Sequence, residues 1–224
     1  MIRVRKSTVT PPSLLAANCN KHDEQDVQDA LMLESDKKCY LCEQYVNKTF
    51  QIEHNKAQTV QPHLRYEWSN LFMSCGYCNG RKSGGYDVLD PATNNIEDLI
   101  THHLDLSRKF ITFNTDHLNP QTLSTVELLS KLFNGKNNLR DVKCKVLYED
   151  LQREYVSFLQ FLLDYKQDDS PLNKQKVIDS LSITKEFLAF KYWLIKGDAV
   201  LFGEFGQYMI WNKRFHNLVH QHKF

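Results

Sequence analysis

The sequence predicts an α+β protein that is mainly α, with a small cysteine-rich module in its first half and a helical domain in its second. Turn-forming residues and potential metal ligands concentrate between Asp36 and Asp90. From Ser124 onward, hydrophobic residues recur at three- and four-residue steps, which is the pattern of amphipathic helices. The 224 residues include 42% hydrophobic and 25% charged residues, a composition that excludes a largely disordered chain.

We expect four segments along the chain, with the boundaries 1–35, 36–90, 91–121 and 122–224. The first segment starts as a basic, proline-containing arm and continues as a helix, whose spaced hydrophobic residues are Val27, Ala30, Leu31 and Leu33. The third segment connects the two modules. It contains a predicted strand over Lys109–Phe113, which is bounded by polar turn residues.

The fourth segment is predicted to be helical. It opens with a capping box, in which Ser124 and Glu127 would each satisfy a backbone N–H at a helix start. The long helix that follows has a hydrophobic stripe made of Val142, Val146, Leu147, Leu151, Tyr155, Phe158, Leu159 and Leu162. Two further helices are predicted over 174–196 and 204–221. Their large side chains cover more than one helix face, so they form either a two-sided core or an interface with another subunit.

Four of the six cysteines form two Cys-x-x-Cys pairs, Cys39/Cys42 and Cys75/Cys78, with 32 residues between the pairs. This spacing is typical of structural zinc sites, and four thiolate ligands leave no open position on the metal. We therefore expect a structural zinc ion, and incidental cytosolic thiols are the alternative interpretation. Cys19 and Cys144 lie outside this pattern.

The overall charge gives no general attraction to polyanions. The chain carries 28 basic and 27 acidic residues, a net charge of +1, so no overall field draws it to nucleic acid or to an anionic membrane. The first residues lack the apolar segment of a secretory signal, and no apolar stretch has the length that a bilayer requires. We expect a cytoplasmic protein that does not act at a membrane.

The segment between the two cysteine pairs carries the residues with the strongest functional signal. A strand-like run ends in Glu53 and His54, Asn70 lies just before the second pair, and Asn79 follows that pair directly. This pattern resembles the HNH, or His-Me finger, nucleases, in which a carboxylate–histidine pair ends the first strand of a ββα-metal core. The resemblance covers about a quarter of the chain. It implies a zinc-stapled ββα-metal HNH module followed by the helical C-terminal domain.

The resemblance also implies roles for individual residues. Glu53 and Asn79 would hold a catalytic Mg²⁺ or Mn²⁺ ion, and Asn70 would tie the loop together through hydrogen bonds to backbone groups. Lys82 could reach a substrate phosphate from the same helix start. The sequence has glutamate where the family usually has aspartate, and the extra methylene changes the position of the carboxylate relative to the metal.

Elementary chemistry explains why such residues occur together. Phosphodiester hydrolysis needs an activated water molecule and a cation that stabilises the charge on the phosphate and the leaving oxygen. A histidine side chain can accept the proton of the water near neutral pH, so we predict that His54 is the general base. Because neighbouring strand residues face opposite sides, Glu53 and His54 can share a site only where the strand ends or bends.

Other candidate residues have a structural interpretation. His63, His102, His103 and His117 are expected to be polar loop residues or local hydrogen-bonding partners. Trp68 is expected to be a core residue of the small module and not a platform for a nucleic-acid base.

Substrate affinity must come largely from outside the cysteine-rich module. Residues 36–90 include seven basic and six acidic residues, and a four-thiolate zinc site adds a charge of −2. Basic residues are found in two other groups, which are Lys136, Arg140, Lys143 and Lys145, and Lys213, Arg214, His216, His220, His222 and Lys223. Solvated helix faces are the alternative interpretation of both groups, and a partner protein is a third source of phosphate contacts.

The basic arm, Leu89-Asp90-Pro91 and the helical second half also resemble the nuclease subunits of Septu anti-phage systems, whose relatives accompany some retrons. That resemblance implies a DNA endonuclease that acts as the effector of a defence complex with an ABC-type, PtuA-like ATPase. A nuclease that cleaves RNA, such as tRNA, in a retron-type system is one alternative. A non-catalytic zinc-binding adaptor is the other.

Overall fold

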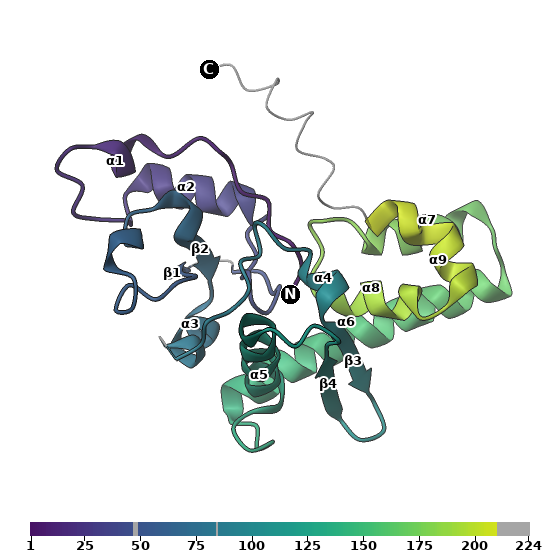
Figure 1. Ribbon diagram of the computed structural model, residues 1–224. Helices are drawn as coiled ribbons and strands as arrows, with labels where there is room; N and C mark the ends of the chain where they lie inside the picture. Colours follow the sequence, from purple (N-terminus) through teal and green to yellow (C-terminus); the bar gives the residue numbers. More distant parts are fainter. Residues whose placement is uncertain (47–48, 84, 210–224) are drawn as a thin grey trace.

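The fold, seen in a computed structural model, combines helices with two small antiparallel sheets and is described for residues 1–46, 49–83 and 85–209 (Figure 1). Its helices are α1 (Pro12–Leu15), α2 (Gln25–Glu34), α3 (Gly76–Lys82), α4 (Ile96–Leu99), α5 (Pro120–Asn134), α6 (Val142–Gln167), α7 (Pro171–Ser180), α8 (Leu188–Lys196) and α9 (Ala199–Phe205). Its strands are β1 (Gln51–His54), β2 (Leu71–Ser74), β3 (Thr101–Asp105) and β4 (Phe110–Asn114). This mixture confirms the predicted α+β, mainly helical class.

The first sheet is the hairpin of β1 and β2, in which Glu53 pairs with Phe72 and His54 pairs with Leu71. Strand β1 ends at His54, so the chain leaves the sheet just after the Glu53-His54 pair. Helix α3 follows β2 directly and packs against β1. Cys75 caps this helix, because its side chain accepts a hydrogen bond from the backbone N–H of Cys78.

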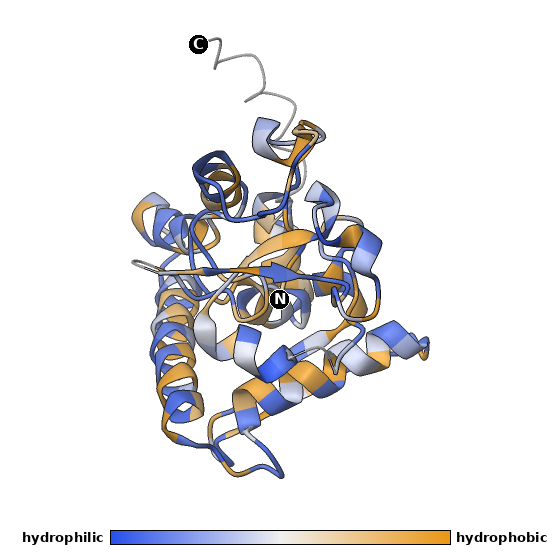
Figure 2. Cartoon of the chain, turned by 90° about the vertical axis from the view of Figure 1, so that its left-hand side faces the viewer, coloured by the Kyte–Doolittle hydropathy of each residue, from blue (hydrophilic) through white to orange (hydrophobic). Residues whose placement is uncertain are grey.

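The main hydrophobic core extends across all four predicted segments of the chain. Its buried residues include Leu41 from the first cysteine pair, Phe72 from β2, Ile111 from β4, Leu129 from α5 and Phe190 from α8. Figure 2 shows stripes of hydrophobic residues along helices whose other faces are hydrophilic. Burial of these stripes is the main source of stability, since helices of this length are marginal by themselves.

Several predicted boundaries differ from the structure. Helix α5 begins at Pro120 and not at Ser124, because Asn119 caps it by accepting a hydrogen bond from the Thr122 N–H, and proline suits the first helical position. The predicted strand at Lys109–Phe113 is confirmed with a shift of one residue, since β4 covers Phe110–Asn114.

The predicted helix over 174–196 is wrong as a single element, because α7 ends at Ser180 and α8 begins at Leu188. The intervening loop is held by Lys38, whose ammonium donates to the carbonyls of Ile183 at 2.5 Å and Lys185 at 2.8 Å. The helix predicted over 204–221 starts earlier, as α9 at Ala199, where Asp198 caps it. Helix α9 ends at Phe205 and is followed by a 3-10 helix over Gly206–Met209, and residues 210–221 of the predicted helix lie outside the described residues.

Three residues predicted to be buried lie on the surface. The exposed fractions of Leu33, Val142 and Val146 are 77%, 77% and 51%. Leu33 lies in the last turn of α2, Val142 is the first residue of α6, and Val146 lies in the second turn of α6. The other predicted stripe residues of α6 are confirmed, and the buried ones are Leu147, Leu151, Tyr155, Phe158 and Leu162.

The N-terminal arm packs along the cysteine-rich module. Arg5 forms an ion pair with Asp36 at 2.9 Å, and the Lys6 ammonium donates to the Leu71 carbonyl at 2.6 Å. The same ammonium lies 3.3 Å from the centroid of the Trp68 ring, a cation–π contact. Trp68 is buried, which confirms its predicted role in the core. Within the described part of the chain, no helix is long and apolar enough to cross a membrane.

Candidate metal centre and catalytic pocket

The four paired cysteines converge to one point. Their sulfur atoms all lie within 4.8 Å of one another, and the Sγ atoms of Cys42 and Cys75 are 4.0 Å apart. Ligands at 2.3 Å around a tetrahedral zinc ion are separated by about 3.8 Å. Cys39 and Cys42 lie in the loop before β1, whereas Cys75 and Cys78 lie at the start of α3. The four thiols can therefore bind one zinc ion, which would join this loop to the helix.

The other two cysteines lie elsewhere. Cys144 is buried on α6 with its thiol 3.2 Å from the Leu132 carbonyl, and the Cys19 thiol is 3.3 Å from the carbonyl of Lys21. In the part of the chain that the structure describes, the four-cysteine cluster is the only group of three or more His, Cys, Asp or Glu residues positioned to hold a metal.

His54 lies at the end of β1 with one ring nitrogen engaged and the other free to act as a base. Its Nε2 atom is 2.9 Å from the carbonyl oxygen of Arg65. A carbonyl can only accept, so Nε2 carries the proton and Nδ1 carries the lone pair. Burial is the largest influence on this ring and lowers the pKa of His54 below its usual value. The imidazole is therefore neutral at pH 7, which is the form that a general base requires.

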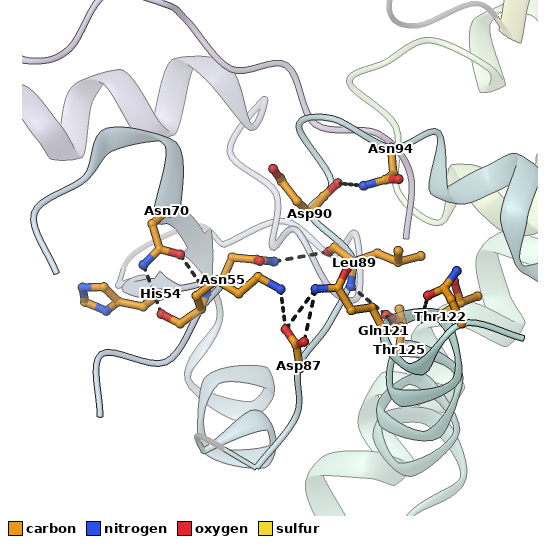
Figure 3. A network of polar contacts seen from close by, with 12 residues as sticks. His54, Asn55, Asn70, Asp87, Leu89, Asp90, Asn94, Gln121, Thr122 and Thr125 are labelled. Carbon is orange, nitrogen blue, oxygen red and sulfur yellow. Dashed lines mark hydrogen bonds and ion pairs between the residues drawn. The ribbon is translucent and has the colours of Figure 1, made fainter. Parts of the chain in front are cut away.

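The turn after His54 is held by Asn70 (Figure 3). The Asn70 side chain accepts from the Lys56 N–H at 2.7 Å and donates to the carbonyls of Lys56 at 3.0 Å and Leu64 at 3.1 Å. Asn55 donates from its side chain to the Leu89 carbonyl at 3.2 Å. The position of His54 is thus set by the hydrogen bonds of Asn70 and by the bond that Asn55 donates to Leu89, in the segment that follows α3.

Lys82 was expected to reach a substrate phosphate, but its side chain points into the protein. Its side chain is fully buried, and its ammonium donates to the carboxylate of Glu53 at 2.7 Å and to the carbonyls of His54 at 2.8 Å and Asn55 at 3.0 Å. All three ammonium protons are therefore engaged inside the protein. The side chain points back under the hairpin because an unpaired Glu53 carboxylate would be costly to bury.

Glu53 was expected to bind a metal ion, but both of its carboxylate oxygens already accept hydrogen bonds. One carboxylate oxygen accepts from Lys82 and the other accepts from the Tyr40 hydroxyl, which lies within the first cysteine pair. Burial raises the pKa of Glu53, while Lys82 and the Tyr40 hydrogen bond oppose that shift. Each oxygen keeps one lone pair, so the carboxylate can still accept a further ligand.

The buried pair should show strong energetic coupling. We expect Lys82→Met to lower the free energy of unfolding by about 3 kcal/mol, because it leaves the Glu53 carboxylate buried and unpaired. In a double-mutant cycle with Glu53→Gln, the coupling energy should be about 2 kcal/mol, measured by urea unfolding of the metal-loaded protein.

The matched control is the pair of Lys56 and Asp87, whose Asp87 side chain is 61% exposed. Its coupling in the same cycle should be no more than about 0.5 kcal/mol, because solvent screens exposed ion pairs. Equal coupling energies for the two pairs would contradict the assignment of Lys82 and Glu53 as a buried structural pair.

Asn79, on α3, lines an open pocket together with His54 and Glu53. Its side-chain NH₂ group donates to the side-chain oxygen of Gln51 on β1. This hydrogen bond leaves the Asn79 amide oxygen as the free atom, and amide oxygens are suitable ligands for Mg²⁺. The structure thus places three of the predicted site residues, His54, Glu53 and Asn79, around one pocket.

His22 is a pocket residue that was not predicted from the sequence. Its ring lies edge-on against His54, with a centroid distance of 4.8 Å, and it lines the same pocket. Its Nδ1 atom is buried and has no hydrogen-bond partner among the described residues. Burial lowers the pKa of His22. No motif or spacing in the sequence connects it with His54, because its loop reaches the pocket only through the packing of α2.

The remaining histidines lie away from this pocket. His102 is a buried residue of β3, where its Nδ1 is 2.9 Å from the Ile100 carbonyl and its ring packs edge-on against Phe113 and Phe190. The contact with Ile100 is the local hydrogen bond that was predicted, but His102 lies in a strand and not in a loop, and its Nε2 is also 3.0 Å from the distant Met1 amino group. His63, His103 and His117 are exposed.

A comparison with known proteins finds similarity to a Septu protein. The chain is 31% identical over 80 residues to a protein described as Septu protein PtuB from Bacillus thuringiensis. The chain resembles a Septu protein over about a third of its length. The match covers 34% of this chain and 31% of that relative, so it spans less than a third of the length of PtuB. No protein-family model matches the chain.

Proposed function

We propose that the protein is a metal-dependent endonuclease of the HNH type that hydrolyses phosphodiester bonds of DNA. The observation that carries the proposal is the open pocket that His54, Glu53 and Asn79 line together, with Nδ1 of His54 left unprotonated because Nε2 donates to the Arg65 carbonyl. Strand β1 and helix α3 contribute residues to this pocket, and the four-cysteine cluster lies at the start of α3, which is the arrangement that the HNH resemblance implies. The similarity to Septu protein PtuB supports a role in anti-phage defence.

The residues of the pocket have separate tasks in this proposal. Nδ1 of His54 accepts the proton of the attacking water, and the Arg65 carbonyl stabilises the imidazolium by accepting from Nε2. Asn79 would hold the catalytic cation through its amide oxygen, and Glu53, although paired with Lys82, would offer a remaining carboxylate lone pair as a second ligand. A bound Mg²⁺ or Mn²⁺ ion supplies positive charge for the phosphate and the leaving oxygen. A zinc ion held by the four cysteines would have a structural role, because four thiolates leave no open position on the metal.

Cleavage should depend on pH with an inflection below the ordinary histidine value. Because burial lowers the pKa of His54, its basic form persists at pH values where a free imidazole is protonated. We therefore expect the single-turnover rate to rise with pH below about 6.5, with a slope of one on a logarithmic scale, and to be level above it. A midpoint above the free-imidazole value would contradict this assignment.

The function is tested by incubating the zinc-loaded chain with plasmid DNA and with tRNA, each with and without added Mg²⁺. We expect cleavage of DNA that requires Mg²⁺, and co-expression with an ABC-type ATPase should increase it. Cleavage of tRNA alone would overturn the DNA assignment. Absence of cleavage of both substrates, with and without the ATPase, would overturn the nuclease proposal.

A further inference from the structure

The positive charge of the chain is concentrated in one short segment that lies against the catalytic module. Residues 131–146 contain five basic residues, Lys131, Lys136, Arg140, Lys143 and Lys145, and one acid, Asp141. The segment therefore carries +4, whereas the chain as a whole carries +1. The rest of the chain has a net charge of −3. A polyanion approaching the protein is attracted to this segment and weakly repelled elsewhere.

The segment is fixed to α3, the helix that carries Asn79. Arg81 forms an ion pair with Asp141, Lys131 donates to the Arg81 carbonyl at 3.3 Å, and the Tyr77 hydroxyl donates to the Leu132 carbonyl at 2.7 Å. Arg81 is two positions from Asn79 on this seven-residue helix. The basic segment and the catalytic pocket are therefore reached from two sides of one short helix.

The only acid of the segment is already paired. Asp141 accepts from the Arg81 guanidinium and, with its other oxygen, from the Cys144 N–H at the start of α6. By contrast, Lys136, Lys143 and Lys145 are exposed, and no acid of the described chain lies within ion-pair distance of them. Their charges are available for phosphates.

The backbone around these lysines is ordered and open. Gly135 adopts a φ of +82°, and a Cβ atom there would lie 2.1 Å from the Leu139 carbonyl oxygen, so this turn requires glycine and fixes the position of Lys136. A groove between α3 and α6 is lined by Gly76, Gly80, Arg81, Asp141, Val142 and Lys143. The two glycines present no side chains, so a sugar–phosphate chain can approach the backbone closely.

We propose that Lys136, Lys143 and Lys145 form a basic edge, attached to α3 through the Arg81–Asp141 ion pair, that binds the backbone of double-stranded DNA and directs it across α3 to the His54 pocket. This inference rests on the proposed nuclease function for its substrate. The N-terminus of α6, a helix of 26 residues, adds a partial positive charge at the same edge. The contacts are to phosphates, so the edge contributes affinity and orientation but no base specificity.

The test compares two triple variants of the full chain. In one, Lys136, Lys143 and Lys145 are replaced by glutamine. In the control, Lys109, Lys166 and Lys185, which are exposed lysines outside residues 131–146, are replaced in the same way. Affinity for a labelled DNA duplex and for an RNA duplex is measured by fluorescence anisotropy at several salt concentrations, with no Mg²⁺ or Mn²⁺ added, so that the DNA is not cleaved and no chelator removes zinc from the four cysteines. Melting temperatures verify that both variants fold.

For DNA, we expect the first variant to bind about tenfold more weakly at moderate salt, with a salt dependence less steep by about 2.7, since each phosphate contact contributes about 0.9 to the slope. The control should bind like the unaltered chain. Equal effects of the two variants, a loss confined to RNA, or no binding of either duplex by the unaltered chain would overturn the proposal. If the variant behaves as expected but no chain cleaves DNA, the basic edge is supported and the nuclease function is not.

Discussion

Replacing His54 by alanine should lower the single-turnover rate of DNA cleavage by a factor of about 10²–10⁴, the usual contribution of a general base. The His54 ring lines the pocket and keeps Nδ1 unprotonated, because Nε2 donates to the Arg65 carbonyl. The substitution removes no contact of the metal centre or of the Lys82 network, so the folded protein should keep its zinc. The rate is measured with Mg²⁺ and saturating protein.

The matched control is His63→Ala, which removes an exposed imidazole from the turn at Pro62–Leu64. It should leave cleavage within about twofold of the unaltered protein, since surface substitutions away from a site have small effects. A His54→Ala protein that is folded, zinc-loaded and fully active would show that another group activates the water. His22, whose ring contacts His54, would then be the first candidate.

Loss of one zinc ligand should have the largest effect on stability. Cys78 is fully buried at the start of α3, and the Cys39 and Cys42 side chains with which it converges belong to the main core. In small metal-dependent modules, zinc binding contributes roughly 10 kcal/mol or more to folding. We expect Cys78→Ser to remove most of that contribution, which would unfold the hairpin and α3 and abolish cleavage.

Two measurements check this expectation. Zinc content by mass spectrometry should fall below one ion per chain, and the thermal transition should broaden or move to a much lower temperature. Cys19→Ser is the control, because Cys19 lies outside the cluster and should leave both quantities unchanged. A Cys78→Ser protein with the melting temperature of the unaltered chain would show that the four cysteines do not stabilise the fold through a metal.

The sequence predicts the parts of the structure that depend on local patterns. Two cysteine pairs with turn-forming residues indicate a metal cluster, and the four sulfur atoms do converge. The end of β1 at His54 follows from a short strand-like run that stops there. The long helix α6 follows from its hydrophobic spacing, which is sustained over several turns.

Features that depend on distant contacts could not be predicted in this way. The break between α7 and α8 is stabilised by Lys38, which is more than 140 residues away in the sequence. In the sequence, Lys82 is only a basic residue near a helix start. The packing of α3 on β1 shows that its ammonium forms an ion pair with Glu53. His22 enters the pocket from a loop before α2 for the same reason. Burial of charged groups is a property of the tertiary structure.

The basic edge illustrates both cases. Its lysines are evident in the sequence, but the same pattern of basic residues also occurs on helix faces that are only solvated. The structure favours a functional role for these lysines, because contacts of Arg81 with Asp141 and Lys131 attach their segment to α3. The second basic group predicted from the sequence, at 213–223, lies outside the described residues.

The most direct test of water activation at His54 is cleavage of a DNA oligonucleotide in ¹⁸O-labelled water, followed by mass spectrometry of the new ends. If His54 activates water for attack on phosphorus, each break has one terminal phosphate that contains one ¹⁸O atom, and the His54→Ala protein yields no such product above the background rate. A break whose phosphate carries no label, or labelled product formed equally fast without His54, would contradict hydrolysis by this residue.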